Sequence, residues 1–101
     1  MYGLYGKMTA HAGQREALLS ALLRGAQMLG DLEGCYAYIV SRATDDEDSV
    51  WVTEVWRSRE DHQASLAHQA IRTLITEARP LIAWMSDRVE FEPVGGKGVP
   101  G

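Results

Sequence analysis

Side chains that could do chemistry gather around residues 56–66. His62 is followed by Ser65 and Leu66 at the i+3 and i+4 positions, so these three residues share one face of a helix. An imidazole with an ordinary pKa of about 6.5 suits a general base near neutral pH. Trp56, just upstream, offers a broad flat surface to a flat ligand. The spacing therefore predicts a base beside an aromatic slot. Core packing of Trp56 and surface exposure of His62 stay open as alternatives.

Further polar candidates come from the same helix and from the strands around it. His68 is the second candidate base. On an ideal helix it is turned by about 120° from His62, so both could reach one pocket only if the helix breaks between them. Tyr5 and either Tyr36 or Tyr38 could donate hydroxyl hydrogen bonds from the sheet. For each tyrosine, simple packing is the alternative interpretation.

Glu54 is a carboxylate in an apolar strand, and it needs a partner. It precedes Trp56 by two residues, so both point to the same face of a strand. A buried carboxylate requires a cation or hydrogen-bond donors. We expect a cation from a second copy of the chain, such as Lys7 or Arg42, and keep a catalytic carboxylate as the alternative.

Hydrophobic periodicity predicts the elements that must position these residues. Strand patterns alternate between strand-forming and polar residues, and helix patterns repeat apolar residues at three and four positions. The predicted strands are 2–9, 35–42, 49–57 and 87–94, and the predicted helices are 14–29 and 58–78, the second with a break near 67–70. Ser58 is the expected N-cap, Pro80 the expected helix stop, and residues 81–85 an apolar linker or a short turn.

The order β-α-β-β-α-β predicts an α+β, ferredoxin-like domain with helices on one face of an antiparallel sheet. We place this single domain at residues 1–94 and a glycine-rich tail at 95–101. Tyrosine, tryptophan and valine occur on both sides of the strands, so the sheet face without helices should be covered as well. A second copy of the chain is the simplest partner, which predicts a homodimer formed through the sheet.

Composition excludes several classes of protein. The chain has 101 residues, a net charge of −4 and no basic cluster, which argues against nucleic-acid binding. One cysteine, no signal-peptide pattern and no long apolar run predict a cytoplasmic protein without a membrane span. We find no metal-ligand cluster and no nucleotide-binding motif, and we interpret the acidic segment 44–48 as a hairpin turn.

Several short motifs occur in the order typical of one family. They are Gly13 before the first helix, Leu32-Glu33-Gly34-Cys35 at the second strand, and Glu54-Val55-Trp56-Arg57-Ser58 at the second helix. In these the chain resembles the antibiotic biosynthesis monooxygenase family of dimeric α/β barrels, which includes quinol monooxygenases. Many members carry a histidine eleven residues after the strand glutamate, where this chain has Ser65. Haem-degrading relatives use an asparagine, and this chain has none.

The resemblance implies a monooxygenase that needs no metal or flavin and oxidises a small quinol, anthrone or phenolic substrate with dioxygen. It implies a dimeric barrel with His62 or His68 as the base and a pocket built from Trp56, Tyr5, Tyr38, Ser65 and Leu66. A non-catalytic ligand-binding or scaffold dimer is the alternative function. A haem-binding relative is the third.

Overall fold

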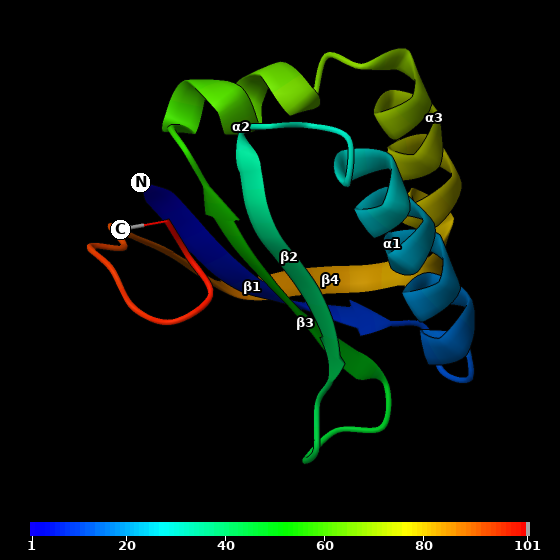
Figure 1. The fold of residues 1–101 in the computed structure, drawn as a ribbon. Helices are drawn as coiled ribbons and strands as arrows, with labels where there is room; N and C mark the ends of the chain where they lie inside the picture. The colour runs from blue at the N-terminus through cyan, green and yellow to red at the C-terminus, as the bar shows by residue number, and fades with distance from the viewer. Residues whose placement is uncertain (101) are drawn as a thin grey trace.

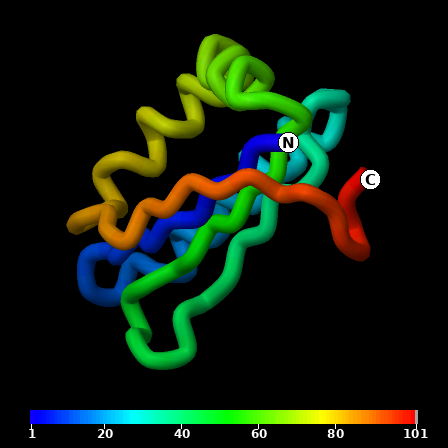
Figure 2. The backbone as a smooth tube through the Cα atoms, turned by 90° about the vertical axis from the view of Figure 1, so that its left-hand side faces the viewer, coloured from blue at the N-terminus to red at the C-terminus, as the bar shows by residue number. Residues whose placement is uncertain are grey.

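The computed structural model describes residues 1–100, and it has the ferredoxin-like order expected from the sequence. The elements in chain order are β1 (Tyr2–Ala10), α1 (Arg15–Leu29), β2 (Cys35–Arg42), β3 (Ser49–Trp56), α2 (Arg59–Ser65), α3 (Gln69–Ala78), the 3-10 turn η1 (Arg79–Leu81) and β4 (Ile82–Phe91). The four strands form one antiparallel sheet in the order β2-β3-β1-β4. The three helices lie on one side of this sheet (Figures 1 and 2).

Alternation along the strands decides which residues face the helices. Leu4 and Ala10 of β1 and Val50 and Val52 of β3 are buried, and the neighbouring even-numbered positions of these strands point the same way. Ala10, Val50 and Val52 pack with apolar residues of α1 and α3, chiefly Leu18, Leu19, Ala21, Leu22, Leu74 and Ala78. Leu4 packs in a second cluster with Leu29 and Trp56. This core fixes α1 and α3 against the sheet and leaves α2 at one end of it.

The second helical region breaks where the sequence predicts. Ser58 caps α2 by accepting a hydrogen bond from the Asp61 backbone N–H at 3.1 Å. The helix ends at Ser65, and α3 begins at Gln69. The chain therefore turns between two short helices, and each can approach the sheet at its own angle.

The last strand differs from the prediction at both ends. Residues 82–85 are neither a linker nor a turn, because β4 already begins at Ile82; only Leu81 lies in the 3-10 turn η1. The strand ends at Phe91 rather than at 94. Asp87 has a φ of 53°, and the pairing with β1 shifts register there. Because the bulge adds a residue to β4, apolar and polar residues do not alternate regularly along it, and the full strand could not be predicted from the sequence. Residues 92–100 form no helix or strand, and Gly101 of the predicted tail lies outside the described residues. Within residues 1–100, no helix has the length and apolar character needed to cross a membrane.

Candidate functional site

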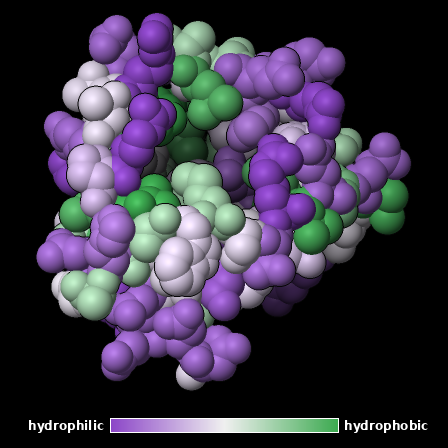
Figure 3. Space-filling view, turned by 180° about the vertical axis from the view of Figure 1, so that it is seen from behind, coloured by the Kyte–Doolittle hydropathy of each residue, from purple (hydrophilic) through white to green (hydrophobic). Residues whose placement is uncertain are grey.

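A cavity of about 280 Å³ lies between the sheet and the helices. Its walls come from every layer of the fold. Its lining residues are Met8, Leu22, Gly25, Leu29, Tyr38, Glu54, Trp56, His62, Ser65, Leu66, Ile71, Ile75, Ala78, Arg79, Ile82 and Met85. In the view from behind, the surface is hollowed at one place with an apolar floor and hydrophilic residues around it (Figure 3). The cavity is close to the lower end of the range of about 300–1,000 Å³ for ligand sites, which favours a small compound.

Trp56 and Glu54 form the polar end of this cavity. Both point to the helix side of β3, and the Trp56 indole Nε1–H donates to Glu54 Oε1 at 2.9 Å. Trp56 is only 1% exposed, and its ring meets the His62 ring edge-on at 5.5 Å between centroids. His62 Nε2 lies 3.8 Å from the same Glu54 oxygen. Two side chains, Trp56 and His62, therefore converge on one oxygen of the Glu54 carboxylate.

Burial shifts the pKa values of this pair in opposite directions. Removal from water lowers the pKa of His62, and the nearby Arg88 guanidinium lowers it further, while Glu90 opposes the change. Removal from water also raises the pKa of Glu54, against the hydrogen bond from Trp56 and the field of Arg88. Both shifts favour uncharged forms, so the imidazole is neutral at pH 7 and available to accept a proton.

Tyr38 and Ser65 complete this end of the cavity with different roles. Burial raises the pKa of Tyr38 far above its ordinary value, and the Glu54 carboxylate raises it further. The Tyr38 hydroxyl therefore stays protonated and can act as a hydrogen-bond donor. Ser65 is buried, and its hydroxyl donates to the His62 carbonyl at 2.6 Å. That bond ties the end of α2 and leaves Ser65 with a packing contribution to the wall.

The amino-acid sequence matches the family model "Antibiotic biosynthesis monooxygenase" over residues 1–77. The match covers well over half of the chain. The chain belongs to the antibiotic biosynthesis monooxygenase family. A comparison with curated proteins gave no match.

Solved structures of similar proteins agree with this assignment. A protein from Chloroflexus aurantiacus J-10-fl, provisionally assigned to the same family, is 44% identical, with 98% of each chain covered and a TM-score of 0.90. A provisionally assigned relative from Deinococcus radiodurans is 22% identical over the whole of both chains, with a TM-score of 0.81. SnoaB from Streptomyces nogalater, described as a cofactor-independent oxygenase, is 19% identical over 95% of each chain, with a TM-score of 0.80. These last two likenesses show the shared fold.

In this family member, most of the candidate residues from the sequence lie around one cavity. The structure brings together five of them: His62, Trp56, Ser65, Leu66 and Tyr38. It separates the other two. Tyr5 lies on the opposite face of the sheet, where its ring is 5.9 Å from Trp51 and 5.9 Å from Phe91. The expectation that Tyr5 lines the pocket is therefore wrong for this chain's own cavity, because odd-numbered residues of β1 face away from the helices.

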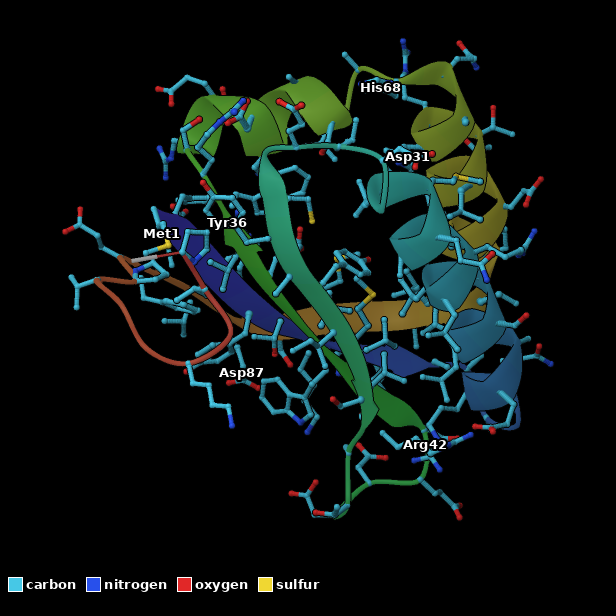
Figure 4. The ribbon with its side chains drawn as sticks, in the orientation of Figure 1. Met1, Asp31, Tyr36, Arg42, His68 and Asp87 are labelled. Carbon is cyan, nitrogen blue, oxygen red and sulfur yellow. The ribbon has the colours of Figure 1, made fainter. Side chains whose placement is uncertain are left out.

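His68 also lies outside the cavity, although the helix does break before it. It occupies the N-cap position of α3, in the connection after α2. It is exposed and sits on the outer side of the helices, away from the sheet (Figure 4). The break between α2 and α3 removes the angular restriction of a continuous helix, but it carries His68 outward. Of the two candidate bases, His62 is the one beside Glu54 and Trp56.

Within one chain, neither Lys7 nor Arg42 reaches Glu54, and the expected cation from a second copy stays a prediction. Lys7 points to the opposite sheet face, where its Nζ stands 5.8 Å from the centre of the Trp51 ring. Arg42, at the far end of β2, forms an ion pair with Glu16 of α1. Glu54 is satisfied inside the chain by the Trp56 indole. The carboxylate is thus part of the cavity and not of the outer sheet face.

The rim of the cavity holds residues that the sequence did not single out. Arg79, Ile82 and Met85 line it from the start of β4 and the turn before it. Ile82 and Met85 fall in the segment 81–85 that the sequence pattern indicated as a linker or a turn. Met8 of β1 pairs with Met85 of β4. That pairing depends on the shift of register that the bulge at Asp87 introduces between the two strands. No local pattern in the sequence specifies that register.

The face of the sheet without helices is apolar and open. Trp84, Ile39, Val89 and Phe91 are exposed there, and Phe91 packs directly over Gly3. A Cβ on Gly3 would lie 2.2 Å from the Phe91 ring, so glycine is needed for this contact. Among residues 1–100, no group of three or more histidine, cysteine, aspartate or glutamate side chains could hold a metal ion on either face.

Proposed function

We propose that this protein is a cofactor-independent monooxygenase that oxidises a small, electron-rich hydroxyaromatic compound with dioxygen. Quinols, anthrones and phenols are the expected substrates. The observation that carries the proposal is the cavity itself, an apolar slot with a neutral imidazole, a carboxyl group and a tyrosine hydroxyl at one end. A scaffold protein would fill this space with its own side chains. Family membership and the shared fold with SnoaB, described as a cofactor-independent oxygenase, support the proposal.

The first step is removal of a proton from the substrate. A hydroxyaromatic ring held against Trp56 would direct its acidic O–H or activated C–H toward the His62 imidazole. When His62 takes the proton, the imidazolium gains an ion-pair partner in Glu54, whose oxygen is 3.8 Å away. The Trp56 hydrogen bond to that oxygen favours the ionised carboxylate at this moment. One proton moves from the substrate to His62, and the ionised Glu54 carboxylate stabilises the imidazolium that forms as the substrate becomes an anion.

The substrate anion then supplies the electrons. It transfers one electron to dioxygen, and the resulting substrate radical and superoxide combine to form a new carbon–oxygen bond. For an anthrone, cleavage of the peroxide O–O bond leaves a carbonyl on the ring. The second oxygen atom leaves as water with the two hydrogens lost from the carbon. The Tyr38 hydroxyl is placed to donate to the developing negative oxygen, in the manner of an oxyanion donor.

We also propose that two copies of the chain associate through the open sheet face. The exposed side chains of Trp84, Ile39 and Val89 lie on the same face as the ring row Trp51, Tyr5 and Phe91. Soluble monomers seldom expose apolar areas of this kind, and a stable dimer needs about 800 Å² from each partner. Association there would leave the cavity of each copy on the far side of its own sheet.

Oxygen uptake tests the proposed activity. Protein dialysed against a chelator would be mixed with an anthrone or with a chemically reduced naphthoquinone, and oxygen consumption would be followed against a protein-free control. We expect saturable uptake above the control, and one atom of ¹⁸O from labelled dioxygen in the anthrone product. Uptake equal to the control, or uptake that requires an added metal ion or flavin, would contradict the proposal.

A further inference from the structure

The two ends of the cavity differ in chemistry. Its inner end carries Glu54, His62 and Tyr38, which are buried or nearly so. Its rim includes the exposed apolar side chains of Leu66, Ile75 and Met85 and one exposed cation, Arg79. Apolar walls separate the inner polar groups from the rim cation. A flat ligand that fills the cavity would therefore meet a base at one end and a guanidinium at the other.

Arg79 differs from the other arginines in having no ion-pair partner while lining the cavity. The chain has eight arginines. Within residues 1–100, six of them form ion pairs: Arg15, Arg24, Arg42, Arg57, Arg59 and Arg88. The two without such a partner in that range are Arg72 and Arg79, both exposed, and only Arg79 borders the cavity. Its charge is therefore free to interact with a ligand.

The polarity of the inner end fixes which group of a ligand would meet Arg79. Glu54 makes the inner end unfavourable for a ligand carboxylate, because two carboxylates in a desolvated site repel each other. A ligand hydroxyl suits that end, since it can donate to the neutral His62 imidazole. At the rim, a carboxylate keeps part of its hydration and can accept two parallel hydrogen bonds from a guanidinium.

We propose that Arg79 is a specificity-determining residue that binds an acidic substituent of the substrate at the mouth of the cavity. The substrate class is then a hydroxyaromatic acid whose hydroxyl and carboxylate lie at opposite ends of a small fused ring system. This inference shares its cavity with the proposed oxygenase function and deepens it. It can be tested by binding alone, without turnover.

The alternative is that Arg79 serves only the fold. It is the C-cap residue of α3, where a positive charge interacts favourably with the helix dipole. That role would lower stability when Arg79 is replaced but would not distinguish an acidic ligand from a neutral one. Arg72, an exposed arginine within α3, provides a matched control for the loss of one positive charge.

The test compares two probes of the same ring size under argon, so that oxidation does not interfere. The probes are 6-hydroxy-2-naphthoate, with hydroxyl and carboxylate on opposite sides, and 2-naphthol, which lacks the carboxylate. Isothermal titration calorimetry would measure both dissociation constants for the unmodified protein and for Arg79→Gln, Arg79→Lys and Arg72→Gln. Thermal unfolding of each variant would establish that it remains folded at the titration temperature.

We expect the unmodified protein to bind the acid about threefold to tenfold more tightly than the naphthol, as for a partly exposed charged contact. Arg79→Gln should abolish this preference without changing the affinity for the naphthol, Arg79→Lys should retain part of it, and Arg72→Gln should retain all of it. Raising the salt concentration should weaken the preference. Equal affinities in the unmodified protein, no binding of either probe, or a preference kept by Arg79→Gln would overturn the proposal. Failure of the oxygenase function would appear separately, as absent oxygen uptake with intact discrimination between the probes.

Discussion

The two faces of β3 make the clearest contrast in this molecule. On the helix side, Glu54 and Trp56 are joined by a hydrogen bond and meet His62 at the end of a cavity. On the open side, Trp51 and Val55 alternate with them. Val55 lies between Gly3 and Ala37, and Trp51 lies beside Lys7 and meets the Tyr5 ring. A single strand therefore supplies a buried polar site to one face and an apolar surface to the other. We propose that the first face carries the chemistry and the second the association.

The difference comes from what covers each face. Three helices cover the inner face, and the break between α2 and α3 leaves room for a cavity under them. Nothing in the described chain covers the outer face, where Trp84 is 61% exposed. Substitutions on the two faces should therefore differ in their effects on stability, assembly and activity.

The largest effect is expected from removing the buried indole. Trp56→Ala should lower the free energy of unfolding by about 3–5 kcal/mol, because it leaves a large void and an unpartnered Glu54 carboxyl. Trp51→Ala on the opposite face is the matched change and should cost the monomer about 1 kcal/mol. Chemical denaturation of both variants measures the difference. Equal losses at Trp51 and Trp56 would contradict the division between the two faces.

The next effect concerns assembly. Phe91→Glu places a charge in the open apolar face and should convert a dimer into a monomer, as measured by light scattering after size-exclusion chromatography. Leu23→Glu, at an exposed position of α1, is the control and should leave the assembly unchanged. A monomeric unmodified protein at high concentration would refute the proposed dimer. So would a Phe91→Glu variant that remains dimeric.

A smaller effect is expected in the pH dependence of activity. In the proposed mechanism the neutral form of His62 is the base. Burial and Arg88 lower its pKa, so the rate should rise with pH through a value below the ordinary histidine pKa and then level off. Arg88→Gln removes a cation that lowers this pKa, so the rising limb should move to higher pH. Arg24→Gln removes an ion pair on the outside of the helices and should not move it. A limb unmoved by Arg88→Gln would show that His62 does not control the profile.

Much of this arrangement could be predicted from local patterns in the sequence. The alternation in 49–57 predicted that Glu54 and Trp56 share a face, and the spacing of His62, Ser65 and Leu66 predicted a common helix face. The Ser58 cap and the break near 67–70 were also confirmed. Each of these features depends on neighbours within a few residues, which is why the sequence alone was sufficient.

The remaining features depend on contacts between distant segments. The start of β4 was missed because the apolar run 81–85 does not alternate clearly and the Asp87 bulge shifts the register. Tyr5 was placed in the pocket because alternation cannot tell which face of β1 meets the helices. Arg79 was missed because its place at the rim depends on how α3 packs over β4.

The most direct test of the account compares the two candidate bases in one assay. Initial rates of oxygen uptake with an anthrone would be measured for the unmodified protein, His62→Ala and His68→Ala at the pH of the plateau. We expect a loss of about a hundredfold or more for His62→Ala, as for removal of a general base, and no change for the exposed His68→Ala. Unchanged turnover in His62→Ala, with the variant folded and the substrate bound, would contradict the central claim that the cavity beside Trp56 and Glu54 is the active site.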